Sequence, residues 1–330
     1  MGELDRDNII IGNNIEALFA SYVLAEHGER SVIIESGDIG KDFLSDGIKY
    51  LFKNDKVIEI FYDLDVPYSE YMMRGGILLR DEIHNYPQIL DNLSMVEIRR
   101  IQYDHFRKTR KTCPSSFGRT LMNDPGMIKT IRCAIKCDFD QLISSLINDS
   151  SIIRRNVEKI HSKSSCVELD HGNLFQYKRL ILTEPLWKIK QRSDFYVPVG
   201  MAMSLNLIHV IPFSSSRFSK WDYVYTTYTP DDAIYRISSS SIGCVAEANG
   251  DWEDIKYNVL SDLAFLFPEG FHIEKQTTNL KGYLLDSQEK IEWPDNVFPL
   301  GKFAQWNSSV SLSDTLLQMY KYTKEWGLKT

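Results

Sequence analysis

The sequence predicts an α/β protein in which a Rossmann-like domain is interleaved with an α+β domain built on an antiparallel sheet. Two observations lead to this expectation. Residues 8–35 read as a strand, a tight turn, a helix and a second strand, which is the order of a βαβ unit. Between residues 190 and 284, several short segments alternate apolar and polar residues, a pattern typical of antiparallel strands with one buried face.

Length and composition are those of an ordinary globular chain. The 330 residues suffice for one large domain or two interleaved ones. Hydrophobic residues make up 43% and charged residues 25%, and no apolar run approaches the roughly 18 residues of a membrane span. The polar N-terminus does not resemble a secretory signal. The five cysteines include no CxxC pair, so we expect reduced thiols, no metal site and a cytoplasmic location.

The first predicted elements are a short buried strand, a helix and a second strand. Residues 8–11 form an apolar run that stops at Gly12, as a buried parallel strand does. A helix is predicted from Ile15 up to Gly28, since glycine commonly follows a helix end. The second strand covers residues 31–34. The apolar residues at helical spacing are Ile15, Leu18, Phe19, Tyr22 and Val23.

The turn after the first strand is similar to the glycine-rich turn of dinucleotide-binding βαβ units. In that turn, three glycines serve the tight turn, the approach of the pyrophosphate and helix packing. Gly12 supplies the first, whereas Asn14 and Ala17 replace the others. We expect Asn14 to adopt left-handed backbone angles and to donate to a phosphate oxygen. Glu35, 23 residues after Gly12, fits an acid that binds a ribose hydroxyl. The alternative is a βαβ unit that binds nothing.

Three further stretches add a family resemblance. Residues 71–87 (YMMRGGILLRDEIHNYP) read as a strand pair around a polar tip. Residues 139–185 read as a helix, a strand, a hairpin and a final apolar strand, and residues 296–307 (NVFPLGKFAQWN) read as a last strand before a helix. In this order, the four stretches resemble the FAD-binding flavoproteins related to amine oxidases, protoporphyrinogen oxidase and UDP-galactopyranose mutase.

The resemblance implies two interleaved domains. An FAD-binding domain of the glutathione-reductase type would comprise residues 1–85, 136–190 and 286–330. A substrate domain with an antiparallel sheet would comprise residues 86–135 and 191–285. FAD is therefore the expected cofactor.

The same resemblance implies which residues bind the cofactor and the substrate. The backbone of Val157 would meet the adenine, and a helix over roughly residues 313–326, capped by Ser311 or Ser313, would point its N-terminus at the flavin. Tyr86 would lie near the substrate, and Trp306 would either face the flavin or pack. The implied cofactor-binding positions are Gly12, Asn13, Asn14, Ile15, Ala17, Glu35, Ser36, Gly40, Arg74, Gly75, Gly76, Val157, Thr183, Gly301, Lys302 and Phe303.

A basic segment lies in the middle of this acidic chain. Residues 99–119 carry seven basic residues and one acid, with three aromatic residues interleaved, although the net charge of the whole chain is -7. One interpretation is a surface that contacts the phosphate of a nucleotide, a nucleotide-sugar or a nucleic acid, with Arg107 and Arg110 as substrate contacts. The other interpretation is a solvated helix face, which is what a run of charged residues usually forms.

The sequence lacks the motifs of several other chemistries, namely GxSxG, HExxH and a P-loop lysine. A flavoenzyme needs none of them, because its cofactor supplies the reactive atom. The resemblance implies an FAD-dependent oxidoreductase that moves a hydride to flavin N5 from a C–H next to N or O, in a phosphate-bearing, nucleotide-like or nucleic-acid-linked substrate. Two alternatives stay open: a non-redox mutase or lyase resembling UDP-galactopyranose mutase, and a non-catalytic nucleotide-binding module. No residue stands out as a catalytic acid or base.

Overall fold

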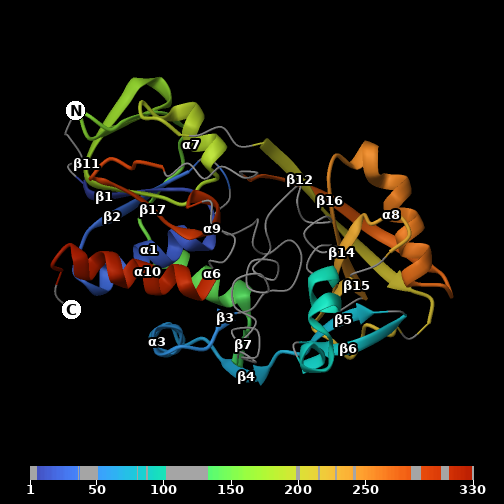
Figure 1. The fold of residues 1–330 in the computed structure, drawn as a ribbon. Helices are drawn as coiled ribbons and strands as arrows, with labels where there is room; N and C mark the ends of the chain where they lie inside the picture. Colours follow the sequence, from blue (N-terminus) through green and yellow to red (C-terminus); the bar gives the residue numbers. More distant parts are fainter. Residues whose placement is uncertain are drawn as a thin grey trace.

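Two seven-stranded sheets and one three-stranded sheet organise the chain in this computed structural model (Figure 1). The described segments nearest to the two chain ends lie in or beside the first sheet, and the second sheet lies apart from them. The structure describes residues 6–35, 37, 51–79, 81–86, 88–101, 133–197, 201–214, 216–226, 229–240, 243–283, 291–305 and 312–328.

The first sheet contains strands β1 (Arg6–Ile11), β2 (Ser31–Ile34), β8 (Ile152–Ile153), β9 (Val157–His161), β10 (Cys166–Leu169), β11 (Asn173–Leu182) and β17 (Val297–Pro299). β1 lies at its centre, parallel to β2 on one side and to β11 on the other. β8 and β17 add further parallel strands, whereas β9 and β10 continue the sheet antiparallel from β11. The strands predicted at residues 8–11 and 31–34 are confirmed.

Helices α1 (Ile15–Glu26), α6 (Phe139–Asn148), α7 (Leu186–Arg192) and α10 (Leu312–Glu325) cover the first sheet, and α3 (Asp55–Asp63) packs against α10. Side chains alternate along β1, so Ile10 packs with α1, α6 and α10, while Ile9 and Ile11 pack with α7, β9 and β10. All three isoleucines are at most 1% exposed, and burial of each contributes about 1.5–3 kcal/mol. The sheet is therefore apolar on both faces, as its parallel strands require.

The second sheet follows the order β16 (Phe271–Tyr283), β12 (Met201–Pro212), β15 (Cys244–Asn249), β14 (Ile234–Ser239), β13 (Tyr223–Thr226), β5 (Gly75–Leu79) and β6 (Glu82–Tyr86). Neighbouring strands are antiparallel except β13 and β5. Helix α8 (Trp252–Leu266) packs on one face through Val259, Leu263 and Leu266. Because β5 and β6 pair into this sheet, the predicted boundary at residue 85 cuts through it. The division into two domains stays a prediction.

The third sheet joins β3 (Leu51–Phe52), β7 (Cys133–Cys137) and β4 (Tyr68–Met72). The two cysteines of β7 are free, and burial raises the pKa of the Cys137 thiol to about 12. This thiol is therefore protonated at neutral pH.

Two local features differ from the sequence expectations. The 13-residue strand β16 was not predicted, because it is a polar edge strand and its apolar alternation is weak. Of the two predicted caps for α10, Ser313 is wrong, because the helix begins at Leu312, and Ser311 lies outside the described residues. Ser313 lies inside the first turn, and its Oγ accepts the backbone N–H of Phe52 at 2.7 Å.

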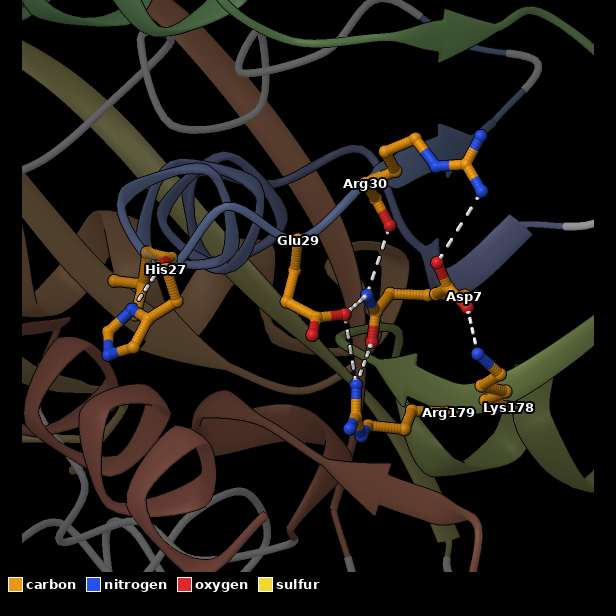
Figure 2. A network of polar contacts seen from close by, with 8 residues as sticks. Asp7, His27, Glu29, Arg30, Lys178 and Arg179 are labelled. Carbon is orange, nitrogen blue, oxygen red and sulfur yellow. Dashed lines mark hydrogen bonds and ion pairs between the residues drawn. The ribbon is translucent and has the colours of Figure 1, made fainter. Parts of the chain in front are cut away.

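A polar network ties β1 and β11 to the chain entering β2 (Figure 2). Asn8 is fully buried, and its Nδ2 donates to Glu29 Oε2 (3.1 Å) and to the carbonyl of Arg30 (3.0 Å). Arg179 Nη1 donates to Asn8 Oδ1 (3.1 Å) and to Glu29 Oε2 (3.2 Å). The Arg179 guanidinium also lies 4.7 Å from the ring centre of Trp326. The side chain of Asn8 thus joins three chain segments.

Replacing Asn8 with Ala is expected to lower the free energy of unfolding by about 1–3 kcal/mol, because Glu29 and Arg179 lose a buried partner. Urea unfolding measures this loss. The matched control is Asn258→Ala, on the exposed side of α8, which we expect to change stability by at most about 0.5 kcal/mol. Equal losses in the two variants would show that the network adds nothing to stability.

Candidate functional site

The carboxyl ends of four parallel strands lie at one edge of the first sheet. β1 ends at Ile11, β2 at Ile34, β11 at Leu182 and β17 at Pro299. From β1 the chain runs through α1 to β2 on one side, whereas β11 lies on the other side. A position in a sheet from which the strand order runs in opposite directions is a topological switch point, the place where open α/β sheets bind ligands.

Gly12 follows β1 directly and has a φ of +142°. A Cβ atom on this residue would lie 2.0 Å from Oγ1 of Thr183, in the turn after β11. Thr183 is held there because its Oγ1 donates to the carbonyl of Ile11 at 3.1 Å. Only glycine therefore fits between these two strand ends.

Asn14 caps α1, and the expected left-handed backbone is wrong. Its φ of -94° and ψ of 171° are extended, as a residue that caps a helix requires. Its Oδ1 accepts the N–H of Ala17 at 3.1 Å, and its Nδ2 donates to the carbonyl of Thr183 at 2.7 Å. The side chain thus fixes the start of α1 against the turn after β11, and both ends of the carboxamide have a protein partner.

Glu35 lies at the end of β2 and is only 8% exposed. Its Oε1 accepts the N–H of Gly37 at 3.2 Å, and its backbone N–H donates to the carbonyl of Ile153 at 3.1 Å. The carboxylate is thereby placed one strand away from the turn at Gly12. This is the position from which an acid reaches a ribose in dinucleotide-binding sheets.

Glu184 was not singled out from the sequence, although it is 2% exposed and its Cγ would lie 3.5 Å from a Cβ on Gly12. Arg192 Nη1 donates to both of its carboxylate oxygens, at 3.1 and 2.9 Å, and Lys188 Nζ lies 3.8 Å away. Burial raises the pKa of Glu184 despite these two cations, and the charge of Glu35 adds to the rise. The glutamate follows Thr183 in a turn, where no sequence pattern marks it as buried.

Gly301 begins the short helix α9 (Gly301–Ala304) directly after β17. Its φ is +85°, and a Cβ there would lie 3.0 Å from Cγ of Glu16 in the first turn of α1. The start of α9 therefore lies against the start of α1. Lys302 and Phe303 follow in α9.

A second group of predicted positions lies in the second sheet. Gly75 and Gly76 open β5, and a Cβ on Gly75 would lie 2.5 Å from Oη of Tyr223. Tyr86 pairs with Gly75 in the hairpin, and burial raises the pKa of its hydroxyl. The backbone N–H of Arg74 donates to Asp222 at 2.6 Å. These residues are close to one another but belong to a different sheet from Gly12.

The remaining predicted positions fall into two classes. Ile15, Ala17 and Val157 are buried in the apolar clusters of the first sheet, and Asn13 lies in the turn. The predicted positions that lie outside the described residues are Ser36, Gly40, Arg107, Arg110 and Trp306.

Two broader features concern the described part of the chain. None of its helices is long and apolar enough to cross a membrane. No group of three or more His, Cys, Asp or Glu side chains within it is arranged to hold a metal ion.

Comparisons with solved structures show the fold. A Pyrococcus furiosus structural-genomics protein has a TM-score of 0.65 at 14% identity over 98% of both chains. Reduced UDP-galactopyranose mutase has a TM-score of 0.64 at 10% identity, over 99% of this chain and 95% of that one. Cyclohexylamine oxidase from Brevibacterium oxydans has a TM-score of 0.62 at 11% identity, over 97% and 100%. No family model and no curated protein matches the sequence. The resemblance to amine oxidases and the mutase is thus confirmed at the level of the fold.

Proposed function

We propose that this protein is an FAD-dependent oxidoreductase of the amine-oxidase-like type. The observation that carries the proposal is the switch point, where the Gly12 turn, the capped start of α1 and the buried Glu35 lie at adjacent strand ends. The structures of cyclohexylamine oxidase and L-proline dehydrogenase share the fold, the latter with a TM-score of 0.62. The residues present fit a dinucleotide, because the turn leaves the N-terminus of α1 facing the strand ends.

Each part of this site has one assigned role. The backbone from Gly12 to Ile15, at the positive end of the α1 dipole, holds the diphosphate. Glu35 accepts hydrogen bonds from the ribose, and Val157 lies by the adenine. Gly301, followed in the sequence by Lys302 and Phe303, brings the start of α9 to the flavin. We assign Ser36 and Gly40 to the same cofactor.

The negative charges of the acids around the turn must be offset, because they would otherwise repel the negatively charged diphosphate. Glu184 is neutralised by Arg192 and Lys188, so it adds little repulsion. When bound, FAD supplies an acceptor for the hydride of a substrate C–H next to N or O. The chain's part is to bind the cofactor, orient it and exclude water from it. The substrate wall in this proposal is the second sheet with Tyr86, and the basic segment with Arg107 and Arg110 binds a phosphate-bearing substrate.

The visible spectrum of the purified protein, followed by mass analysis of the molecule released on denaturation, tests the proposal. We expect flavin absorption and the mass of FAD. Glu35→Ala should weaken FAD binding by about tenfold or more, because a charged hydrogen-bond partner is lost. Glu158→Ala, an exposed acid on β9, is the matched control and should leave FAD affinity unchanged. A protein that stays colourless after incubation with FAD would instead support a non-catalytic module.

A mutase or lyase is the second candidate, because reduced UDP-galactopyranose mutase matches as well as the oxidases do. Turnover that requires prior reduction of the flavin, without net electron flow, would favour it. Dye reduction or oxygen consumption during turnover would favour the oxidoreductase.

A further inference from the structure

The face of the second sheet opposite α8 carries a buried polar group without a partner. Ala246 and Ala248 of β15 pack toward α8, so the alternate residues Glu247 and Asn249 lie on the opposite face. Asn249 is 9% exposed, and neither its Oδ1 nor its Nδ2 has a hydrogen-bond partner. Figure 1 draws α8 on the side of this sheet away from the first sheet. The face that carries Asn249 is therefore the one turned toward the candidate cofactor site.

Glu247, the neighbour of Asn249 on this face, is fully paired. Its Oε2 accepts from the hydroxyl of Tyr235 at 2.6 Å, and its Oε1 accepts from Arg236 Nε at 2.8 Å and Nη2 at 2.5 Å. Adjacent residues of a strand normally point to opposite faces, but a β-bulge between Ile234 and Arg236 lets Tyr235 and Arg236 reach the same carboxylate. The carboxylate beside Asn249 is thus neutralised, which favours an uncharged ligand group.

Two hydroxyls on the same face, those of Thr277 and Ser238, are like Asn249 in being buried without a hydrogen-bond partner. Thr277 pairs with Leu207, which in turn pairs with Glu247, so its side chain lies on that face. Ser238 pairs with Val245 and lies there too. Both Oγ atoms are buried and have no hydrogen-bond partner. Native proteins pair nearly all such atoms, so the four on this face, spread over β14, β15 and β16, are separate positions that ligand atoms would satisfy.

We propose that Asn249 recognises a neutral, planar substrate group that carries a hydrogen-bond donor beside an acceptor, as in an amide, a lactam or the edge of a nucleobase. The carboxamide presents an acceptor oxygen next to a donor nitrogen, and this pattern pairs with such a group through two parallel hydrogen bonds. The inference rests on the proposed function, since the group belongs to the substrate of the flavin site.

Binding of three small probes to the purified protein tests the proposal. The probes are 2-piperidone, a lactam; uracil, a nucleobase; and cyclohexanone, which has the acceptor but no donor. Ligand-observed NMR titration should show 2-piperidone, uracil or both binding about tenfold more tightly than cyclohexanone, since a site built for a donor rejects the analogue that lacks it. Binding of uracil alone would identify a nucleobase, and binding of both would identify amide-type groups in general.

The key variant is Asn249→Leu, with Asn258→Leu on the exposed side of α8 as its control. Asn249→Leu should abolish the preference over cyclohexanone and leave Tm unchanged or higher, because it removes an unpaired buried polar group. Asn258→Leu should keep the preference. A preference that survives Asn249→Leu, or its absence in the natural protein, would overturn the proposal.

A variant that fails to fold does not end the test. Unfolding of Asn249→Leu would mean that Asn249 has a structural partner, and this too would count against the proposal unless Asn249→Asp folds and binds 2-piperidone at least about tenfold more weakly. The visible spectrum of the same samples reports flavin separately. Yellow protein without probe discrimination would overturn only this inference, whereas protein that stays colourless after incubation with FAD would overturn the proposed function.

Discussion

Gly12→Ala is expected to remove bound flavin and to lower the free energy of unfolding by about 3–5 kcal/mol. The added Cβ would lie 2.0 Å from Oγ1 of Thr183, and the φ of +142° is one that alanine rarely adopts. Thr183 has little freedom to move, because its Oγ1 bonds to the carbonyl of Ile11 and its own carbonyl accepts from Asn14. The two strand ends must therefore separate. Urea unfolding and the visible spectrum measure the two effects.

Two controls separate the clash from the backbone strain. Gly28, just after α1, has a φ of +69° and open space around the position of its Cβ. Gly28→Ala should therefore cost only about 1–2 kcal/mol and leave flavin content unchanged. In the second control, Thr183→Ala is combined with Gly12→Ala, and the combination should cost less than the sum of the single changes. Retention of stability and flavin by Gly12→Ala would refute the assigned role of this turn.

Asp262→Ala is expected to destabilise the protein by about 4 kcal/mol. Asp262, in α8, is fully buried, and its carboxylate accepts four hydrogen bonds from one loop of the second sheet. The hydroxyl of Thr229 donates at 2.8 Å, and the backbone N–H groups of Asp231, Ala233 and Ile234 donate at 2.9, 2.7 and 2.9 Å. Alanine would remove the acceptor that these four donors share, and the bonds from Thr229 and Ile234 are buried. The loss should appear as a lower midpoint in urea unfolding.

Asp254→Ala is the matched control, because Asp254 lies on the same helix but is exposed. It should cost at most about 1 kcal/mol, the value of an acid near a helix N-terminus. If the two substitutions destabilised the protein equally, the hydrogen bonds to Asp262 would not be a main support of the loop.

The sequence predicted the elements of the opening unit because their signals are local. The strand at residues 31–34 and the helix from Ile15 depend on apolar spacing within a few residues, and the helix end depends on Gly28. The expectation for Asn14 was wrong because the conformation of this residue depends on a distant contact. The sequence shows that asparagine tolerates left-handed angles, but not that Thr183, 169 positions away, supplies a carbonyl that favours a helix cap.

The residues around the site that sequence reasoning missed are those whose role depends on distant contacts. Glu184 follows an apolar strand, as many surface acids do. Only the fold shows that it is buried close to Gly12 and that it is bonded to Arg192. Asn249 is the last residue of a strand, where polar residues are common, so the sequence does not mark it as a site residue. Register with β12 places it on the face opposite α8.

By itself, the sequence determined the βαβ unit, the glycine its turn requires and the acid at the end of β2, because each depends on the spacing of neighbours along the chain. Only the tertiary structure decided that hairpin β5–β6 joins the second sheet, that Glu184 lies under Gly12 and that Asp262 holds a loop of that sheet. The physical reason is that burial and hydrogen-bond partners come from segments far apart in sequence. The chain contains 45 acidic residues, and nothing local distinguishes the few that folding removes from water.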